Sequence, residues 1–222
     1  MTEYDIKMSL GHVLIDNGEG WVLVDTGSPL SFHESGRLLL CGEYTNVPTS
    51  LMGVDADYIS EKTGERVRGL VGMDFIGRYG VKIDIPGGKL SFGCPTDGLM
   101  RVPSDIGLMG GYVTIKMHLN GRLATVILDT GAPISYVAPS FTQGLPIEDT
   151  VTDFNPFVAG ETFVTHLFKF PASFAGQEFT MRAGHLPSTM QVMLMMLGAD
   201  GVVGLEILSR FPIVIANGSV WV

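Results

Sequence analysis

Two stretches of the chain are nearly identical and carry the same acid: residues 22–32 read VLVDTGSPLSF and residues 126–136 read VILDTGAPISY. In each stretch three apolar residues lead straight into the acid, Asp25 or Asp129. Such an apolar run is typical of a buried strand, so each carboxylate is expected at the end of a strand and close to the core. A phrase that occurs twice in one chain predicts two similar structural units.

Other segments repeat in the same order around these phrases. The segment IKMSL at residues 6–10 returns as IKMHL at 115–119. The segment LVGMDFI at residues 70–76 returns as VVGLEIL at 202–208. The connections between the segments differ in length, which turn-rich loops tolerate well. Short β-branched or aromatic runs bounded by Gly, Asn, Asp and Pro predict strands, with helical turns only near 74–79 and 206–211.

The repeat therefore predicts an all-β protein made of two pseudo-symmetric lobes with a few short helices. The stretch PTDGLMRVPSDIGLMGG, at residues 95–111, is rich in Gly and Pro and lacks periodicity, as expected of a connection. We place the N-terminal lobe at 1–97, the linker at 98–110 and the C-terminal lobe at 111–222.

Composition and charge narrow the function classes. The chain has 222 residues, of which 45% are hydrophobic and 17% charged, and a net charge of −9. This composition predicts a packed globular protein, and no Lys/Arg-rich stripe offers the contacts that nucleic acid needs. The five histidines show no metal-ligand spacing, so we expect neither a metal nor a cofactor.

Location is predicted from the apolar runs. The first ten residues, MTEYDIKMSL, lack the apolar segment of a secretory signal, so a cytoplasmic protein is expected. The run MQVMLMMLG, at residues 190–198, is about half the length that spans a bilayer and is predicted to lie in the core. No membrane partner is expected.

The repeated acids suggest a chemistry. A buried carboxylate is stable only when it is hydrogen-bonded, and the Thr-Gly pairs after Asp25 and Asp129 supply a hydroxyl and closely approaching backbone N–H groups. Equivalent residues of two similar lobes meet near an approximate two-fold axis. Two carboxyl groups about 3 Å apart share one proton, so one acts as an acid and the other as a base.

The doubled DTG triplets, each followed by an apolar-apolar-Gly segment, resemble the aspartic peptidases. Each lobe is similar to a retropepsin subunit, and the fused pair is similar to pepsin. The resemblance implies the acid-protease fold with β-barrel-like lobes, in which Asp25 and Asp129 hold the nucleophilic water. It also implies supporting roles: the threonines brace the dyad, the first glycines bring backbone N–H groups to it, and two later glycines pack under its loops (Thr26, Thr130, Gly27, Gly131, Gly72 and Gly204).

The residue after each triplet differs between the two copies. Ser28 follows the first triplet and keeps a hydroxyl that is common in pepsin-like enzymes, whereas Ala132 follows the second. We expect Ser28 to donate a hydrogen bond to ionised Asp25, which would make Asp25 the partner with the lower pKa.

The flap that closes over substrate in this family is predicted in the second lobe, where more residues separate the DTG triplet from the Gly segment. Residues 154–170 (FNPFVAGETFVTHLFKF) read as two strands around a turn at Ala159, Gly160 and Glu161. An ordinary peripheral hairpin is an equally good interpretation. Tyr44 and Tyr58 are weak candidates for the flap tyrosine of the first lobe.

The predicted function is that of a monomeric aspartic endopeptidase, which hydrolyses an extended peptide or protein substrate next to large apolar residues. Two alternatives stay open. One is a peptide-binding module of the same fold that has lost turnover. The other is a narrow processing enzyme that acts on one protein, which could be the chain itself.

Overall fold

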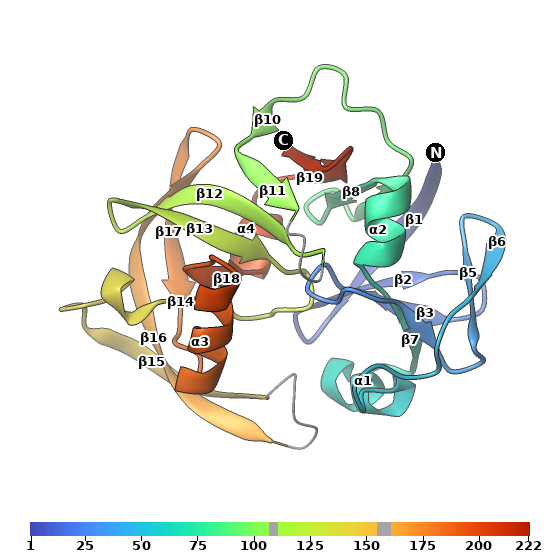
Figure 1. The fold of residues 1–222 in the computed structure, drawn as a ribbon, viewed down its shortest axis with the longest axis horizontal. Helices are drawn as coiled ribbons and strands as arrows, with labels where there is room; N and C mark the ends of the chain where they lie inside the picture. Colours follow the sequence, from blue (N-terminus) through green and yellow to red (C-terminus); the bar gives the residue numbers. More distant parts are fainter. Residues whose placement is uncertain (107–110, 155–160) are drawn as a thin grey trace.

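The computed structural model describes residues 1–106, 111–154 and 161–222, and these residues form mainly β-strands (Figure 1). The strands make two large sheets and one small hairpin, β5 (Arg37–Leu40) with β6 (Glu43–Asn46). The described residues include four α-helices and a 3-10 turn: α1 (Ala56–Thr63), α2 (Met73–Tyr79), α3 (Ser188–Met196), α4 (Leu205–Leu208) and η1 (Pro139–Phe141). The prediction of a mainly β protein is confirmed. None of the described helices is both long and apolar enough to cross a membrane.

The first large sheet has ten strands in the order β10-β20-β19-β8-β9-β1-β2-β3-β7-β4. Their bounds are β1 (Thr2–Ser9), β2 (His12–Asp16), β3 (Trp21–Val24), β4 (Phe32–His33), β7 (Val67–Val71), β8 (Val81–Asp84), β9 (Lys89–Phe92), β10 (Arg101–Val102), β19 (Ile213–Ala216) and β20 (Ser219–Trp221). The long strand β1 joins its two parts, because its first half pairs with β9 and its second half with β2. Strand β3, which leads into the first acid, lies parallel to β7.

The second large sheet follows the order β14-β18-β13-β12-β16-β15, with β11 added on β12 and β17 on β16. Its strands are β11 (Ser104–Ile106), β12 (Val113–Leu119), β13 (Arg122–Leu128), β14 (Tyr136–Val137), β15 (Ile147–Phe154), β16 (Thr162–Phe174), β17 (Gln177–Ala183) and β18 (Gly201–Val203). Strand β13 lies parallel to β18, as β3 lies parallel to β7. Strand β14 pairs antiparallel with β18, as β4 pairs antiparallel with β7. The sequence repeat is therefore a repeat of strand pairing. Within the described residues neither sheet closes into a barrel.

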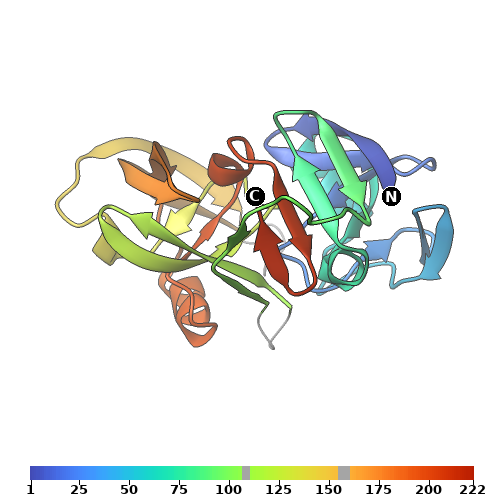
Figure 2. The same cartoon turned by 90° about the horizontal axis from the view of Figure 1, so that it is seen from above.

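The end of the chain returns to the first sheet. Strand β19 pairs antiparallel with β8, and β20 pairs with β10. Figure 2 shows this C-terminal hairpin between the two halves of the molecule. The predicted division at residues 97 and 111 stays a prediction, but the last two strands add to the sheet of the N-terminal half.

Helix α1 covers the outer face of the N-terminal half. Its first turn is capped by Asp55, which accepts a hydrogen bond of 2.9 Å from the backbone N–H of Tyr58. It ends at Gly64, whose φ of 71° is a left-handed conformation that glycine adopts readily. Below it lies a small apolar core of buried side chains: Leu14, Leu23, Phe32, Ile59, Val67 and Leu70. This core fixes α1 beside the end of β3.

Helix α3 differs from the prediction. The Met-rich run was expected in the core, yet Met190 is its buried member, whereas Met195 and Met196 are 74% and 76% exposed. The helix lies on the outside of the second sheet (Figure 1). Because only one side of such a helix meets the protein, an apolar run all around it leaves several methionines at the surface.

Candidate active site

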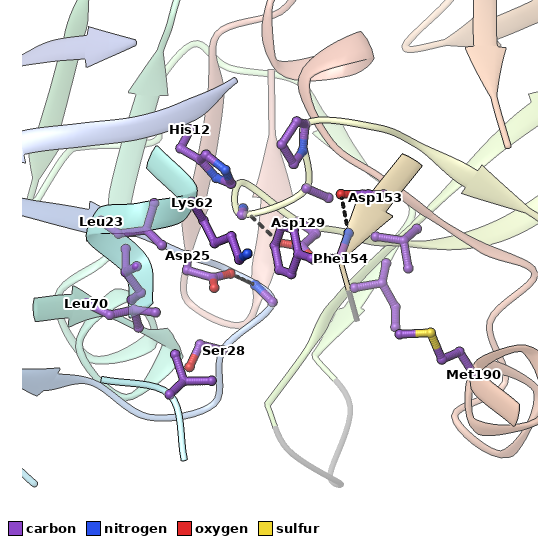
Figure 3. Close-up of a pocket in the computed structure, with 18 of the residues that line it drawn as sticks. His12, Leu23, Asp25, Ser28, Lys62, Leu70, Asp129, Asp153, Phe154 and Met190 are labelled. Atoms are coloured by element: carbon purple, nitrogen blue, oxygen red, sulfur yellow. Dashed lines mark hydrogen bonds between the residues drawn. The ribbon is translucent and has the colours of Figure 1, made fainter. Parts of the chain in front are cut away.

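The two DTG loops meet at the centre of the molecule. Asp25 follows β3 and Asp129 follows β13, and their backbone N–H groups donate to Val71 and Val203 of the adjacent parallel strands at 3.0 and 2.9 Å. The two carboxyl groups are neighbours, since each lies against the glycine of the other triplet, whose N–H donates to the other acid. The repeat thus places two acids in direct contact, each at the end of a buried strand (Figure 3).

The threonines Thr26 and Thr130 lock the two loops together. Each backbone N–H donates to the hydroxyl of the other threonine, at 3.0 Å in both directions. Each hydroxyl then donates to a carbonyl of the opposite strand, Thr26 to Leu128 at 2.7 Å and Thr130 to Val24 at 2.6 Å. Both threonines are fully buried, so this symmetric set of bonds fixes the separation of the loops without help from water.

We expect Thr26→Ala to destabilise the protein strongly. The substitution leaves two buried groups, the Leu128 carbonyl and the Thr130 N–H, without their partner, which costs about 2–5 kcal/mol in the free energy of unfolding. Thr26→Ser keeps the hydroxyl and loses one methyl group, so the free energy of unfolding is expected to fall by about 1 kcal/mol. Denaturant unfolding of the two variants checks this; equal losses would show that the hydroxyl bonds do not hold the loops together.

The glycines Gly27 and Gly131 let each loop approach the other acid. Each N–H donates to the carboxylate of its own triplet at 2.8 Å. A Cβ atom added at Gly27 would lie 2.5 Å from Cγ of Asp129, and one added at Gly131 would lie 2.7 Å from Cγ of Asp25. Each glycine therefore packs against the acid of the opposite triplet, and no larger residue fits there.

The later glycines Gly72 and Gly204 lie under the same loops. A Cβ atom at Gly72 would lie 2.7 Å from the carbonyl oxygen of Leu30, and one at Gly204 would lie 3.0 Å from that of Asp129. Their N–H groups donate to the hydroxyls of Ser31 and Ser135. These two serines were not singled out from the sequence, although they occupy the same place in the repeated phrase.

Burial raises the pKa of both acids. Burial raises the pKa of Asp25 well above its usual value, and the charge of Asp129 and the hydrogen bond to it raise it further. Burial also raises the pKa of Asp129, while hydrogen bonds from Asp25 and from the N–H groups of Gly131 and Gly27 oppose the rise. The pair therefore keeps one proton to a higher pH than an isolated aspartate does.

These raised pKa values predict how stability changes with pH. A group with a raised pKa in the folded state contributes stability below its ordinary pKa and loses that contribution as the pH rises through the raised value. Asp25→Asn removes the contribution, so the variant is expected to gain melting temperature relative to the parent protein between acidic and neutral pH. Thermal melts across this range check it, with exposed Asp97→Asn as the control. A parallel pH dependence of parent and Asp25→Asn would contradict the raised values.

The residues after the triplets are arranged otherwise than expected. The Ser28 hydroxyl donates to the carbonyl of Leu30 at 2.8 Å. Of the groups of Ser28, the backbone N–H rather than the hydroxyl favours ionised Asp25. The predicted hydroxyl bond to Asp25 is therefore wrong, because the turn carries the Leu30 carbonyl within reach of the side chain. Which of the two acids has the lower pKa stays a prediction. Ala132, like Ser28, lines the cleft beside the acids.

A cleft with a volume of about 300 Å³ opens above the two acids. Its walls use equivalent residues of the repeat, Leu23 with Ile127, Phe32 with Tyr136, and Leu70 with Val202. Helix α1 adds one wall, and α3 adds the other; Figure 1 shows these helices on the same side of the molecule, one in each half. The cleft thus has two related apolar ends with the acids between them, as a site for an extended ligand requires.

The predicted flap strands form the hairpin β15–β16, in which Phe154 pairs with Thr162. Ala159 and Gly160 lie outside the described residues, and Glu161 is exposed. The hairpin lines the cleft through Asp153, Phe154 and Phe163, which lie at the loop ends of its two strands.

Two contacts connect the loop end of this hairpin to the walls of the cleft. The Tyr136 hydroxyl donates to Asp153, and the ring of Phe154 lies edge-on to Tyr58, with centroids 6.5 Å apart. The hairpin therefore reaches from the second sheet to α1 of the N-terminal half. Tyr58, a weak flap candidate, lines the cleft, whereas Tyr44 is 53% exposed and donates to Glu19.

Two cleft residues were missed in the sequence. Tyr112 lines the cleft. Burial, and then the charges of Asp129 and Asp25, raise the pKa of its hydroxyl. His12 is buried at the cleft, its Nδ1 has no hydrogen-bond partner among the described residues, and burial lowers its pKa. Neither belongs to a repeated motif, so only the folded chain brings them to the site. Among the described residues, no group of three or more His, Cys, Asp or Glu side chains is placed to hold a metal.

Comparison with known proteins gives a likeness of fold. No known family model matches the chain, and no curated protein matches it. Among solved structures, a retropepsin-like aspartic protease from Rickettsia conorii is similar, with a TM-score of 0.37 and 15% sequence identity. The match covers 54% of this chain and 96% of the other.

Proposed function

We propose that the chain is an aspartic endopeptidase whose two halves are pseudo-symmetric lobes of the acid-protease type, fused as in pepsin. The observation that carries the proposal is the contact between the carboxyl groups of Asp25 and Asp129 on the floor of an apolar cleft. Two adjacent buried acids destabilise a fold, since each disfavours the ionisation of the other. Their presence on the floor of a cleft therefore favours a catalytic use. The substrate is a peptide in extended form, and the protein acts as a cytoplasmic monomer.

The dyad supplies an acid and a base. Ionised Asp129 takes a proton from a water held between the two carboxyl groups, and the water oxygen attacks the carbonyl carbon of the peptide bond. Asp25 gives its proton to the carbonyl oxygen, which forms a tetrahedral gem-diol; transfer of a proton to the amide nitrogen then releases the amine. Assigning the shared proton to Asp25 is part of this proposal, supported by burial and the charge of Asp129, which raise the pKa of Asp25 well above its usual value.

The hairpin β15–β16 serves as the flap. The loop ends of its strands line the cleft and contact α1, so a substrate strand would lie between the hairpin and the acids. Main-chain groups of the substrate would pair with strand edges, and its side chains would alternate between the two apolar ends, as in other cases of β-strand addition. The flap excludes water, which strengthens the electrostatic interactions of the dyad.

The test is hydrolysis of a peptide library. The purified protein is incubated with the library from about pH 4 to about pH 7, a range that spans raised carboxyl pKa values, and products are identified by mass spectrometry. Cleavage next to large apolar residues that disappears in the dyad variants supports the peptidase. Binding of peptides without cleavage at any pH would instead identify a peptide-binding module. Cleavage confined to the chain itself would identify a self-processing enzyme.

A further inference from the structure

The two ends of the cleft are related by the repeat but differ in charge. At the α3 end the helix contributes apolar side chains, Met190, Met193 and Leu194. At the α1 end the helix contributes Tyr58 and Lys62, which are four positions apart and so lie on the same face. Lys62 is therefore the lysine of the described cleft lining, in a protein with a net charge of −9.

The ammonium group of Lys62 lies between two aromatic rings. Its Nζ is 5.1 Å from the ring centroid of Tyr58 and 5.8 Å from that of Phe154, on the flap hairpin. Figure 3 shows its side chain extending from α1 towards Phe154, across the mouth of the cleft. Contacts of a cation with ring faces hold the charge in place while leaving its N–H donors available for an anion.

The ion pair that Lys62 makes in the described structure is weak. Its Nζ is 3.1 Å from Oε1 of Glu61, the neighbouring residue, whose side chain is 74% exposed while that of Lys62 is 21% exposed. Exposed pairs of this kind contribute little to stability. A carboxylate that entered the cleft would form a drier and stronger pair with Lys62, because the local dielectric is lower there.

The other charges of the cleft sharpen this preference. Asp25 and Asp129 share a negative charge on the floor, and Asp153 adds a carboxyl group from the flap hairpin near His12. These acidic groups repel a substrate carboxylate, whereas Lys62 attracts it. A substrate lysine or arginine beside Lys62 is repelled in turn.

We propose that Lys62 is a specificity-determining residue, which selects peptides with an Asp or Glu side chain at the α1 end of the cleft and an apolar residue at the α3 end. The inference rests on the proposed peptidase function, because it assumes a peptide in this cleft. Its chemistry is a charge-assisted hydrogen bond between the ammonium group and the substrate carboxylate.

The experiment uses a positional-scanning octapeptide library with two readouts. Parent protein is used to identify cleaved peptides, and immobilised Asp25→Asn is used to identify bound peptides, so that recognition is measured apart from turnover. The best sequence is then synthesised as a Glu peptide and as its Gln counterpart. We expect the Glu peptide to be favoured on the order of tenfold in kcat/KM, mainly through KM, and to a similar extent in binding.

The variants separate the role of the charge from other effects. Lys62→Met is expected to bring the Glu/Gln ratio close to one, and Lys62→Glu is expected to shift selection towards Lys or Arg. Two controls keep Lys62: Glu61→Gln removes its exposed partner, and Lys89→Met removes a surface charge that pairs with Glu3 and Asp5. Both controls are expected to keep the preference for Glu.

The outcomes of the two ideas differ. Cleavage without any preference for acids, or a Glu/Gln ratio unchanged in Lys62→Met, overturns the role of Lys62 and leaves the peptidase intact. Selective binding of Glu peptides without cleavage supports the role of Lys62 and overturns the peptidase. If the protein neither binds nor cleaves any peptide of the library, both the role of Lys62 and the peptidase are overturned.

Discussion

Replacing either acid of the dyad, Asp25→Asn or Asp129→Asn, is expected to lower peptide hydrolysis by at least about a thousandfold, since each variant removes the acid or the base from the shared-proton pair. An amide has nearly the shape of a carboxylic acid, so the cleft and its hydrogen bonds are largely kept. The loss therefore falls on kcat, while binding of peptides continues. The measurement is kcat and KM on a peptide identified from the library.

The two variants together test the dyad more sharply than either one alone. Because both acids act on one water, the double variant is expected to lose little more than each single variant, as residues that act as a unit do. Asp97→Asn is the matched control, since Asp97 is an exposed acid at the end of the predicted N-terminal lobe. Losses in the single variants that multiply in the double variant would show that the two acids work independently.

Much of the centre of the fold could be predicted because the repeat constrains it. Two buried strands ending in DTG can be packed as equivalent units in few ways, and the exchange of bonds between Thr26 and Thr130 follows from that symmetry. The positions of Gly72 and Gly204 under the loops were implied by the resemblance to the aspartic peptidases. What repeats in the sequence could be placed without coordinates.

The remaining features depend on what does not repeat. The hydroxyl of Ser28 turns to Leu30 rather than to Asp25, and a sequence does not specify which of two nearby acceptors a rotating hydroxyl reaches. Helix α3 lies beside the cleft with several methionines exposed, because an apolar pattern all around a helix does not specify which side meets the protein. The return of β19 to β8 joins residues far apart in the chain, and the hydrophobic pattern of a strand does not name its partner.

The asymmetry of the cleft arises from these non-repeated parts. The repeat supplies two like apolar ends and the acids between them, whereas α1, α3 and the flap hairpin are added separately in each half. The repeated residues would then perform the chemistry, while the added elements, Lys62 among them, would choose the substrate. This division lets specificity change without disturbing the dyad.

The second large effect is expected from glycine. Gly27→Ala and Gly131→Ala each place a Cβ atom 2.5–2.7 Å from Cγ of the opposite acid, which is too close for two non-bonded carbons, so the two carboxyl groups must separate. Because the shared proton and the water require both groups within hydrogen-bond reach, we expect kcat to fall by about a hundredfold or more in each variant. Kinetic assays on the same peptide measure this.

Gly77→Ala is the matched control for these two substitutions. Gly77 lies within α2, its added Cβ atom meets nothing within 4 Å, and its backbone is helical. Alanine there is expected to leave kcat unchanged and to stabilise the protein by about 0.5–1 kcal/mol, because glycine is the poorer helix former. The separation of the acids should also show in the pH profile of kcat/KM, since a parted dyad shares no proton and its two pKa values move closer together. Full activity in Gly27→Ala or Gly131→Ala would mean that turnover does not need the contact between Asp25 and Asp129, and the proposed mechanism would be wrong.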